Sequence, residues 1–144
     1  MIWKLLVPAG VVLAVVTAAC GGAAEVGSGS TADPRVIEVS ALDTLAYEPG
    51  TIEVGAGETV TFVVTNTGEV DHEFVVGDEE IQAMAEEEMS EGMHGHTESM
   101  AALAVEPGET KEATITFDAA GTLQYACHVE GHYRGGMVGT IEIT

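Results

Sequence analysis

Basic side chains are scarce in this sequence. Only 4 of its 144 residues are Lys or Arg, against 24 Asp and Glu, and the formal net charge is −20 at pH 7. Binding to nucleic acid depends on cations that meet phosphate groups, so this charge excludes nucleic acid as a partner. The charge either steers basic partner proteins, such as cytochromes, toward the molecule or only keeps it soluble. The sequence leaves both explanations open.

The sequence also lacks the motifs of several enzyme classes. It contains no Gly-rich phosphate-binding loop and no nucleophile elbow of the hydrolase type. A chain of 144 residues has room for one domain with a leader and a linker. We therefore predict that the protein is not an enzyme.

The apolar run near the start of the chain is short for a membrane span. It covers 15 residues, 5–19, whereas a spanning helix needs about 18 or more. With Lys4 before it and small residues up to Cys20 after it, segment 1–20 has the layout of an export signal. It resembles a bacterial lipoprotein signal, which implies lipidation of Cys20 and an anchor at the extracytoplasmic face of the cell membrane. An ordinary signal peptide cleaved near Cys20 is the alternative.

Cysteine is scarce as well, with only Cys20 and Cys127 in the chain. If Cys20 carries lipid, Cys127 has no disulfide partner. An unpaired thiol outside the cytoplasm is either reactive or occupied, and a bound metal would protect it. A bridge between the two cysteines is the alternative, although it would tie a domain to its leader and stabilise little.

The rest of the chain is punctuated like an antiparallel β protein. Segment 21–34 is small, polar and typical of a flexible linker, and the domain is expected at 35–144. Short β-branched segments there alternate with turn signals such as EPG and NTGE. The expected strands are 36–40, 51–54, 59–65, 73–76, 112–117, 122–127 and 138–144. This spacing predicts an all-β fold, a two-sheet β-sandwich with Greek-key connections.

One segment, 78–100, interrupts the strand pattern and reads as an insertion. It is acidic, without a basic residue, and its first half contains good helix formers. Ile81, Met84 and Ala85 fall at helical spacing and could place a short amphipathic helix on the sandwich. We expect the insertion to be helical at its start and loop-like after Gly92.

Soft metal ligands gather in one stretch near the end of the chain. Cys127 ends a predicted strand, His132 follows in the loop, and Met137 opens the last strand. His72, at the start of an earlier predicted strand, can supply a fourth ligand from a neighbouring strand. Two imidazoles and a thiolate, with a weak axial thioether, form the ligand set of an electron-transfer copper site. We therefore expect a mononuclear copper site, with one copper ion per chain.

The spacing C-x4-H-x4-M, together with an upstream N-x-G-x3-H-x-F from Asn66 to Phe74, resembles the cupredoxins, the plastocyanin and azurin superfamily. The stretch CHVEGHYRGGM is most similar to exported bacterial cupredoxins, some of them associated with copper tolerance. The resemblance covers about 51–144. It implies a Greek-key sandwich, with His72, Cys127 and His132 as strong ligands and Met137 as the axial one.

Two positions depart from the family pattern. Glu73 stands where relatives usually carry an Asn that braces the ligand loop, and Glu130 stands where many carry a proline. Both positions influence how rigidly the ligands are held, so the sequence leaves a blue or a green site open. His128, directly after Cys127, is expected on the opposite face of the strand, as a solvent-facing contact for electron exchange and not as a ligand.

The insertion carries a second set of sulfur and imidazole side chains. These are Met84, Met89, Met93, His94, His96 and Met100. The set resembles low-affinity copper-binding stretches of copper-handling proteins. The alternative is that the methionines cover the sandwich, since methionine is a common packing residue.

Two functions fit these features. The first is a one-electron carrier, a monomer that docks transiently with redox partner proteins. The second is copper sequestration for copper tolerance, in which the insertion binds additional ions. Copper enzymes fit less well, because their second copper centre needs further histidines and further domains.

Overall fold

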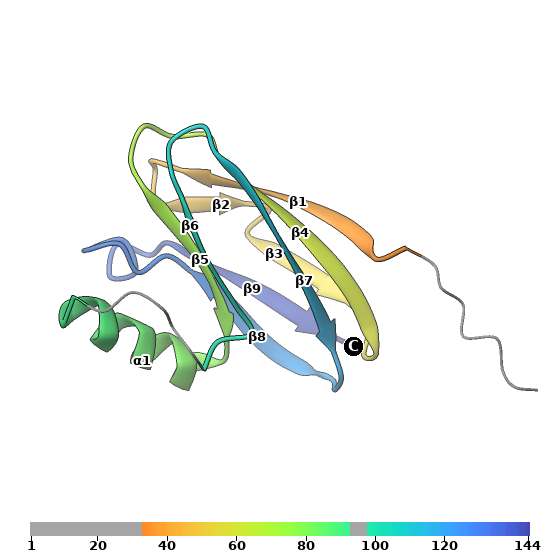
Figure 1. Ribbon diagram of the computed structural model, residues 1–144. Helices are drawn as coiled ribbons and strands as arrows, with labels where there is room; N and C mark the ends of the chain where they lie inside the picture. The colour runs from red at the N-terminus through yellow and green to blue at the C-terminus, as the bar shows by residue number, and fades with distance from the viewer. Residues whose placement is uncertain (1–32, 93–97) are drawn as a thin grey trace, which may run out of the picture. The chain divides into compact units, whose positions relative to one another are not determined.

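The computed structural model describes residues 33–92 and 98–144 (Figure 1). The predicted signal 1–20 with Cys20, most of the predicted linker 21–34, and Met93, His94 and His96 lie outside the described residues. In the described ranges, no helix has both the length and the apolar character needed to cross a membrane.

The described residues form two β-sheets (Figure 1). The first has the order β2-β1-β4-β7, and the second has the order β3-β9-β8-β5-β6. Their strands are β1 (Arg35–Leu42), β2 (Ala46–Glu48), β3 (Thr51–Val54), β4 (Glu58–Asn66), β5 (His72–Gly77), β6 (Ala101–Val105), β7 (Thr110–Phe117), β8 (Gly121–Ala126) and β9 (Val138–Ile143). β1 pairs with β4 and β3 with β9 in parallel, and the other pairs are antiparallel. The predicted two-sheet sandwich is confirmed.

Strand β4 shows how the sequence builds the core. Val60, Phe62 and Val64 are fully buried, while Thr59, Thr61 and Thr65, at alternate positions of the strand, lie on its other face. Those threonines bond across to threonines of β7, as in the 2.8 Å contact between the Thr61 and Thr114 hydroxyls. Successive side chains of a strand point to opposite faces, so this alternation places one face in the core and pairs the other in register.

The predicted insertion begins with helix α1 (Glu79–Ser90). Its first turn is capped by Asp78, whose carboxylate accepts a hydrogen bond from the Ile81 N–H at 2.9 Å. The helix ends before Gly92, whose φ of 75° lies in the left-handed region that favours glycine. The predicted helical start is therefore confirmed.

The buried face of α1 differs from the expected one. Gln82 and Ala85 are buried against the sandwich, whereas Met84 is 36% exposed. A polar side chain takes the central place because it satisfies main-chain carbonyls of the sheet, as described below. Strand β6 follows at the end of the predicted insertion and pairs with β5.

Candidate metal centre

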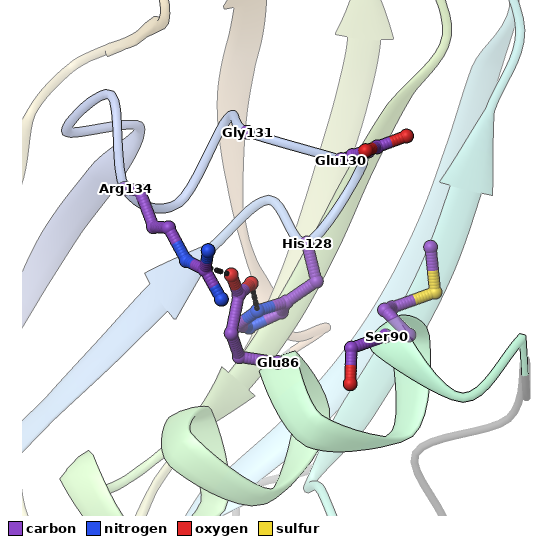
Figure 2. A pocket seen from close by; sticks show the side chains of 7 residues that line it. Glu86, Ser90, His128, Glu130, Gly131 and Arg134 are labelled. Atoms are coloured by element: carbon purple, nitrogen blue, oxygen red, sulfur yellow. Dashed lines mark hydrogen bonds and ion pairs between the residues drawn. The ribbon is translucent and has the colours of Figure 1, made fainter.

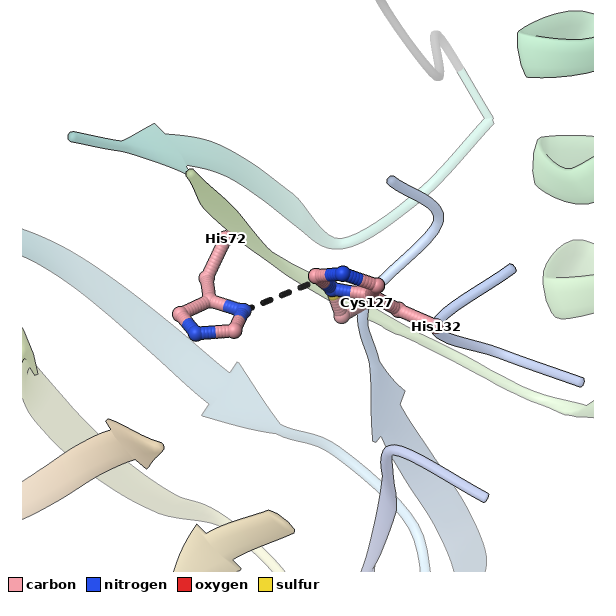
Figure 3. Close-up of side chains that lie close together, drawn as sticks. All are labelled: His72, Cys127 and His132. Atoms are coloured by element: carbon pink, nitrogen blue, oxygen red, sulfur yellow. Dashed lines mark hydrogen bonds between the residues drawn. The ribbon is translucent and has the colours of Figure 1, made fainter. Parts of the chain in front are cut away.

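Three potential ligands from separate elements converge at one end of the sandwich (Figure 3). His72 is the first residue of β5, Cys127 directly follows β8, and His132 lies in the turn before β9. The Cys127 Sγ atom lies 3.4 Å from Nδ1 of His132 and 3.9 Å from Nδ1 of His72. All three ligand atoms lie within 4.8 Å of one another.

These separations fit a single shared ion. Metal–sulfur and metal–nitrogen bonds of about 2.3 and 2.0 Å, the lengths found in zinc sites, hold S and N about 3.5–3.7 Å apart at angles of about 110–120°. The observed sulfur–nitrogen distances of 3.4 and 3.9 Å lie on either side of this interval. A thiolate with two imidazoles is a soft donor set that suits copper.

The site is closed to water on most sides. His72, Cys127 and Met137 are buried, and His132 keeps part of its ring exposed. Burial raises the pKa of the Cys127 thiol to about 11, so the free protein holds its proton and metal binding must displace it. Burial also lowers the pKa of His132, with a smaller contribution from the charge of His72, which favours the neutral ring that a metal needs.

Met137 closes the loop that carries two of these ligands. Its N–H donates to the His132 carbonyl at 3.0 Å, and its carbonyl accepts from the Cys127 N–H at 3.2 Å. The side chain is fully buried in the hydrophobic core. The hydrogen bond between Cys127 and Met137 thus joins the two ends of the predicted ligand loop.

A turn next to β5 holds the His72 side of the site. Oδ1 of Asp43 lies 3.2 Å from His72 Nε2, and its Oδ2 accepts from the Glu69 N–H at 2.8 Å. This main-chain hydrogen bond is the first cause that lowers the pKa of Asp43, with His72 a smaller one. The Glu73 N–H donates to Cys127 Sγ at 3.3 Å, and the Tyr47 hydroxyl donates to the Glu73 carbonyl. Glu73 therefore supports the cysteine through its main chain.

Helix α1 holds the other side (Figure 2). The Nε2 atom of His128 lies 2.8 Å from Gln82 Oε1, and its Nδ1 lies 3.3 Å from Glu86 Oε2. The other oxygen of Glu86 pairs with Arg134 Nε at 3.0 Å. Glu86 thus contacts the ligand loop at both His128 and Arg134. These three residues line a pocket of about 300 Å³.

The prediction of a solvent-facing His128 is wrong. The side chain is only 1% exposed, because α1 covers the face toward which strand alternation directs it. His128 is also outside the group of converging ligand atoms, as expected. No pattern in the sequence signals that Gln82 and Glu86, more than 40 positions earlier, cover it.

Comparison with known proteins agrees with this geometry. Residues 35–144 match the model of the copper binding proteins of the plastocyanin/azurin family. The chain belongs to this family. It is 37% identical over 139 residues to the copper-resistant cuproprotein CopI of Pseudomonas aeruginosa, with 76% of each chain covered. It is 34% identical over 137 residues to auracyanin-A of Chloroflexus aurantiacus, with 84% of this chain and 85% of the relative covered.

A solved auracyanin of Roseiflexus castenholzii superposes with a TM-score of 0.68 at 29% identity, covering 76% of this chain and 96% of that chain. The predicted resemblance to the cupredoxins is thereby confirmed, as is copper as the metal of the family. The spacing of the ligands in the sequence did not reveal the contact of Asp43 with His72 or the contacts of α1 with His128.

The second predicted set of copper ligands is only partly described. Met84 and Met100 are exposed, and Met89 is half-buried beside His128 and Glu86. Met93, His94 and His96 lie outside the described residues. Copper binding by this set stays a prediction.

Proposed function

We propose that the protein is a one-electron carrier with one mononuclear copper ion. In this proposal His72, Cys127 and His132 would hold the ion as strong ligands, and Met137 would be a weaker fourth ligand. The observation that carries it is the convergence of one sulfur and two ring nitrogens within 4.8 Å at a buried end of the sandwich. Bound copper would supply a one-electron couple there.

The protein's part is to hold the ligands in one arrangement. His72 and Cys127 are set by strands β5 and β8, which pair with each other, so the main-chain ladder fixes their separation. Burial of both side chains excludes water from the sulfur. The partly exposed ring of His132 offers an edge through which an electron can pass to a docked partner.

The partners in this proposal are redox proteins that dock transiently. The formal charge of −20 favours basic ones, such as cytochromes, through long-range attraction. We propose a monomer located outside the cytoplasm, attached to the membrane through lipid at Cys20. The export layout of 1–20 supports this location.

Copper sequestration is the second proposal. It is favoured by the likeness to a relative named as a copper-resistant cuproprotein and by the methionine and histidine residues of 84–100. A buffer would use the same site and bind further copper through these side chains. The two proposals differ in stoichiometry, since a carrier needs one ion and a reversible potential.

Copper titration with visible absorption tests the first proposal. The purified protein is expected to bind one Cu(II) ion with an intense thiolate charge-transfer band, and Cys127→Ser should abolish the band completely. Retention of the band in Cys127→Ser would contradict the assignment.

Titration with Cu(I) separates the two functions. A carrier saturates at one ion per chain, whereas a buffer takes up several. Replacement of Met89, Met93, His94 and His96 together by Ala would remove the excess in a buffer and leave the first ion in place.

A further inference from the structure

Asp43 faces the side of the His72 ring that points away from Cys127. It lies in the turn between β1 and β2, 29 positions before His72, and its Oδ1 atom is 3.2 Å from Nε2. The other ring nitrogen, Nδ1, is the one that faces Cys127 Sγ, at 3.9 Å. A carboxylate that accepts a hydrogen bond from Nε2–H keeps the proton on that nitrogen and leaves the Nδ1 lone pair available for a metal.

Main-chain groups of the segment before β5 hold this carboxylate in place. Oδ2 accepts from the Glu69 N–H at 2.8 Å, and Oδ1 lies 3.4 Å from the Val70 N–H. Gly68 passes so close that a Cβ there would lie 1.9 Å from Oδ1 and 2.5 Å from Cγ of Asp43. The carboxylate can occupy this place only because residue 68 has no side chain.

We propose that Asp43 is a positioning residue for the copper site, acting through His72. It keeps the proton of His72 on Nε2, and its negative charge behind the ring favours the oxidised ion over the reduced one. Asp43 thereby lowers the reduction potential of the site, since a nearby anion attracts a doubly charged ion more strongly than a singly charged one. This proposal rests on the proposed function, with His72 as a ligand.

Two variants separate the position of the carboxylate from its charge. Asp43→Ala removes both the hydrogen bond and the charge, whereas Gly68→Ala keeps the charge and displaces the carboxylate. Asp71→Asn is the matched control, because it removes the same charge from an exposed side chain next to His72 in the sequence. Asp43→Asn keeps an oxygen acceptor for the Glu69 N–H and serves if Asp43→Ala does not fold.

The reduction potential of the full chain is the first readout. Loss of a carboxylate behind a histidine ligand costs about tenfold or more in metal affinity. We expect Asp43→Ala to weaken Cu(II) binding by this factor and Cu(I) binding less. Each tenfold change in the affinity ratio raises the potential by about 59 mV. Gly68→Ala should raise the potential in the same direction, and Asp71→Asn should raise it clearly less.

The tautomer of His72 in the copper-free full chain is the second readout, measured by ¹⁵N NMR. We expect the Nε2–H form in the wild type and a shift toward the Nδ1–H form in Asp43→Ala. This measurement does not depend on copper, so it tests the contact even if the proposed function fails because the wild type binds no copper.

The proposal is overturned if Asp43→Ala keeps the wild-type potential, or if Asp71→Asn shifts the potential as much as Asp43→Ala does. It is also overturned if copper-free wild type carries its His72 proton on Nδ1.

Discussion

The two histidines of the site are held by different means. His72 is buried, belongs to a strand that lies between β8 and β6, and is contacted from behind by Asp43. His132 is partly exposed and lies in a turn. The loop that carries His132 is held by side chains of α1, through Glu86 with His128 and Arg134.

This difference divides the site into a fixed side and an adjustable side. A ladder of main-chain hydrogen bonds sets the main-chain position of His72, and the contact with Asp43 acts on its ring. The loop around His132 depends on polar side chains from an inserted helix, so changes in that helix reach the metal from a distance. Variants on the two sides should therefore fail in different ways.

The largest expected effect is the loss of a histidine. His72→Gly should abolish copper uptake, because the gap lies in the buried part of the site. His132→Gly opens the site toward solvent, so excess imidazole should enter and restore the charge-transfer band. Visible absorption with and without imidazole measures both. Equal rescue of the two variants would contradict the division into a closed and an open side.

A substitution in helix α1 should have a smaller effect, a measurable loss of folding stability. Gln82 is fully buried, and its Nε2 donates to the carbonyls of Val75 and Gln124 at 3.0 and 3.2 Å. Gln82→Leu leaves buried polar groups without partners at about 1–3 kcal/mol each, so we expect a loss of about 2–4 kcal/mol in the free energy of unfolding. Urea denaturation of the copper-free protein measures it.

The control for this variant is Glu87→Gln, an exposed change on the same helix, which should stay within about 0.5 kcal/mol of the wild type. If Gln82→Leu were as stable as this control, the helix would not hold the loop through Gln82.

Cys127, where the two sides meet, gives the smallest predicted effect, a pH dependence of the copper-free protein. Burial raises the thiol pKa from its ordinary 9.0 to about 11. Between pH 9 and pH 11 the thiol is therefore ionised in the unfolded chain but still protonated in the folded one, which favours unfolding. Stability contributed by the protonated thiol is complete below pH 9 and declines as pH rises toward 11. The loss at pH 10 is about 1 kcal/mol relative to neutral pH.

The matched comparison is copper-free Cys127→Ser, whose hydroxyl does not ionise in this pH range. Denaturation curves at pH 8 and pH 10 should show a larger decline for the wild type. Identical declines would show that the folded protein does not retain the thiol proton.

Most of the sandwich could be predicted from the sequence, because its strands alternate and are bounded by turn signals. The expected strand 51–54 matches β3 in full. Two strands were missed: β2 has only three residues, and β6, with the sequence AALAV, is rich in residues that favour helices. Both became strands by pairing with β1 and β5, which is a tertiary effect.

The converging ligands could be anticipated from spacing and chemistry, but their surroundings could not. Asp43 and Gln82 are single polar residues without a motif, and the fold brings them to His72 and His128 across 29 and 46 positions. The burial of His128 could not be predicted for the same reason. Strand alternation indicates the face on which a side chain lies, but not which element covers that face.

A crystal structure of the copper-loaded protein, with anomalous scattering at the copper edge, tests the central claim most directly. The account predicts one strong peak bonded to Cys127 Sγ and to Nδ1 of both His72 and His132. A peak elsewhere, such as beside the methionines of α1, with none at Cys127, would contradict it.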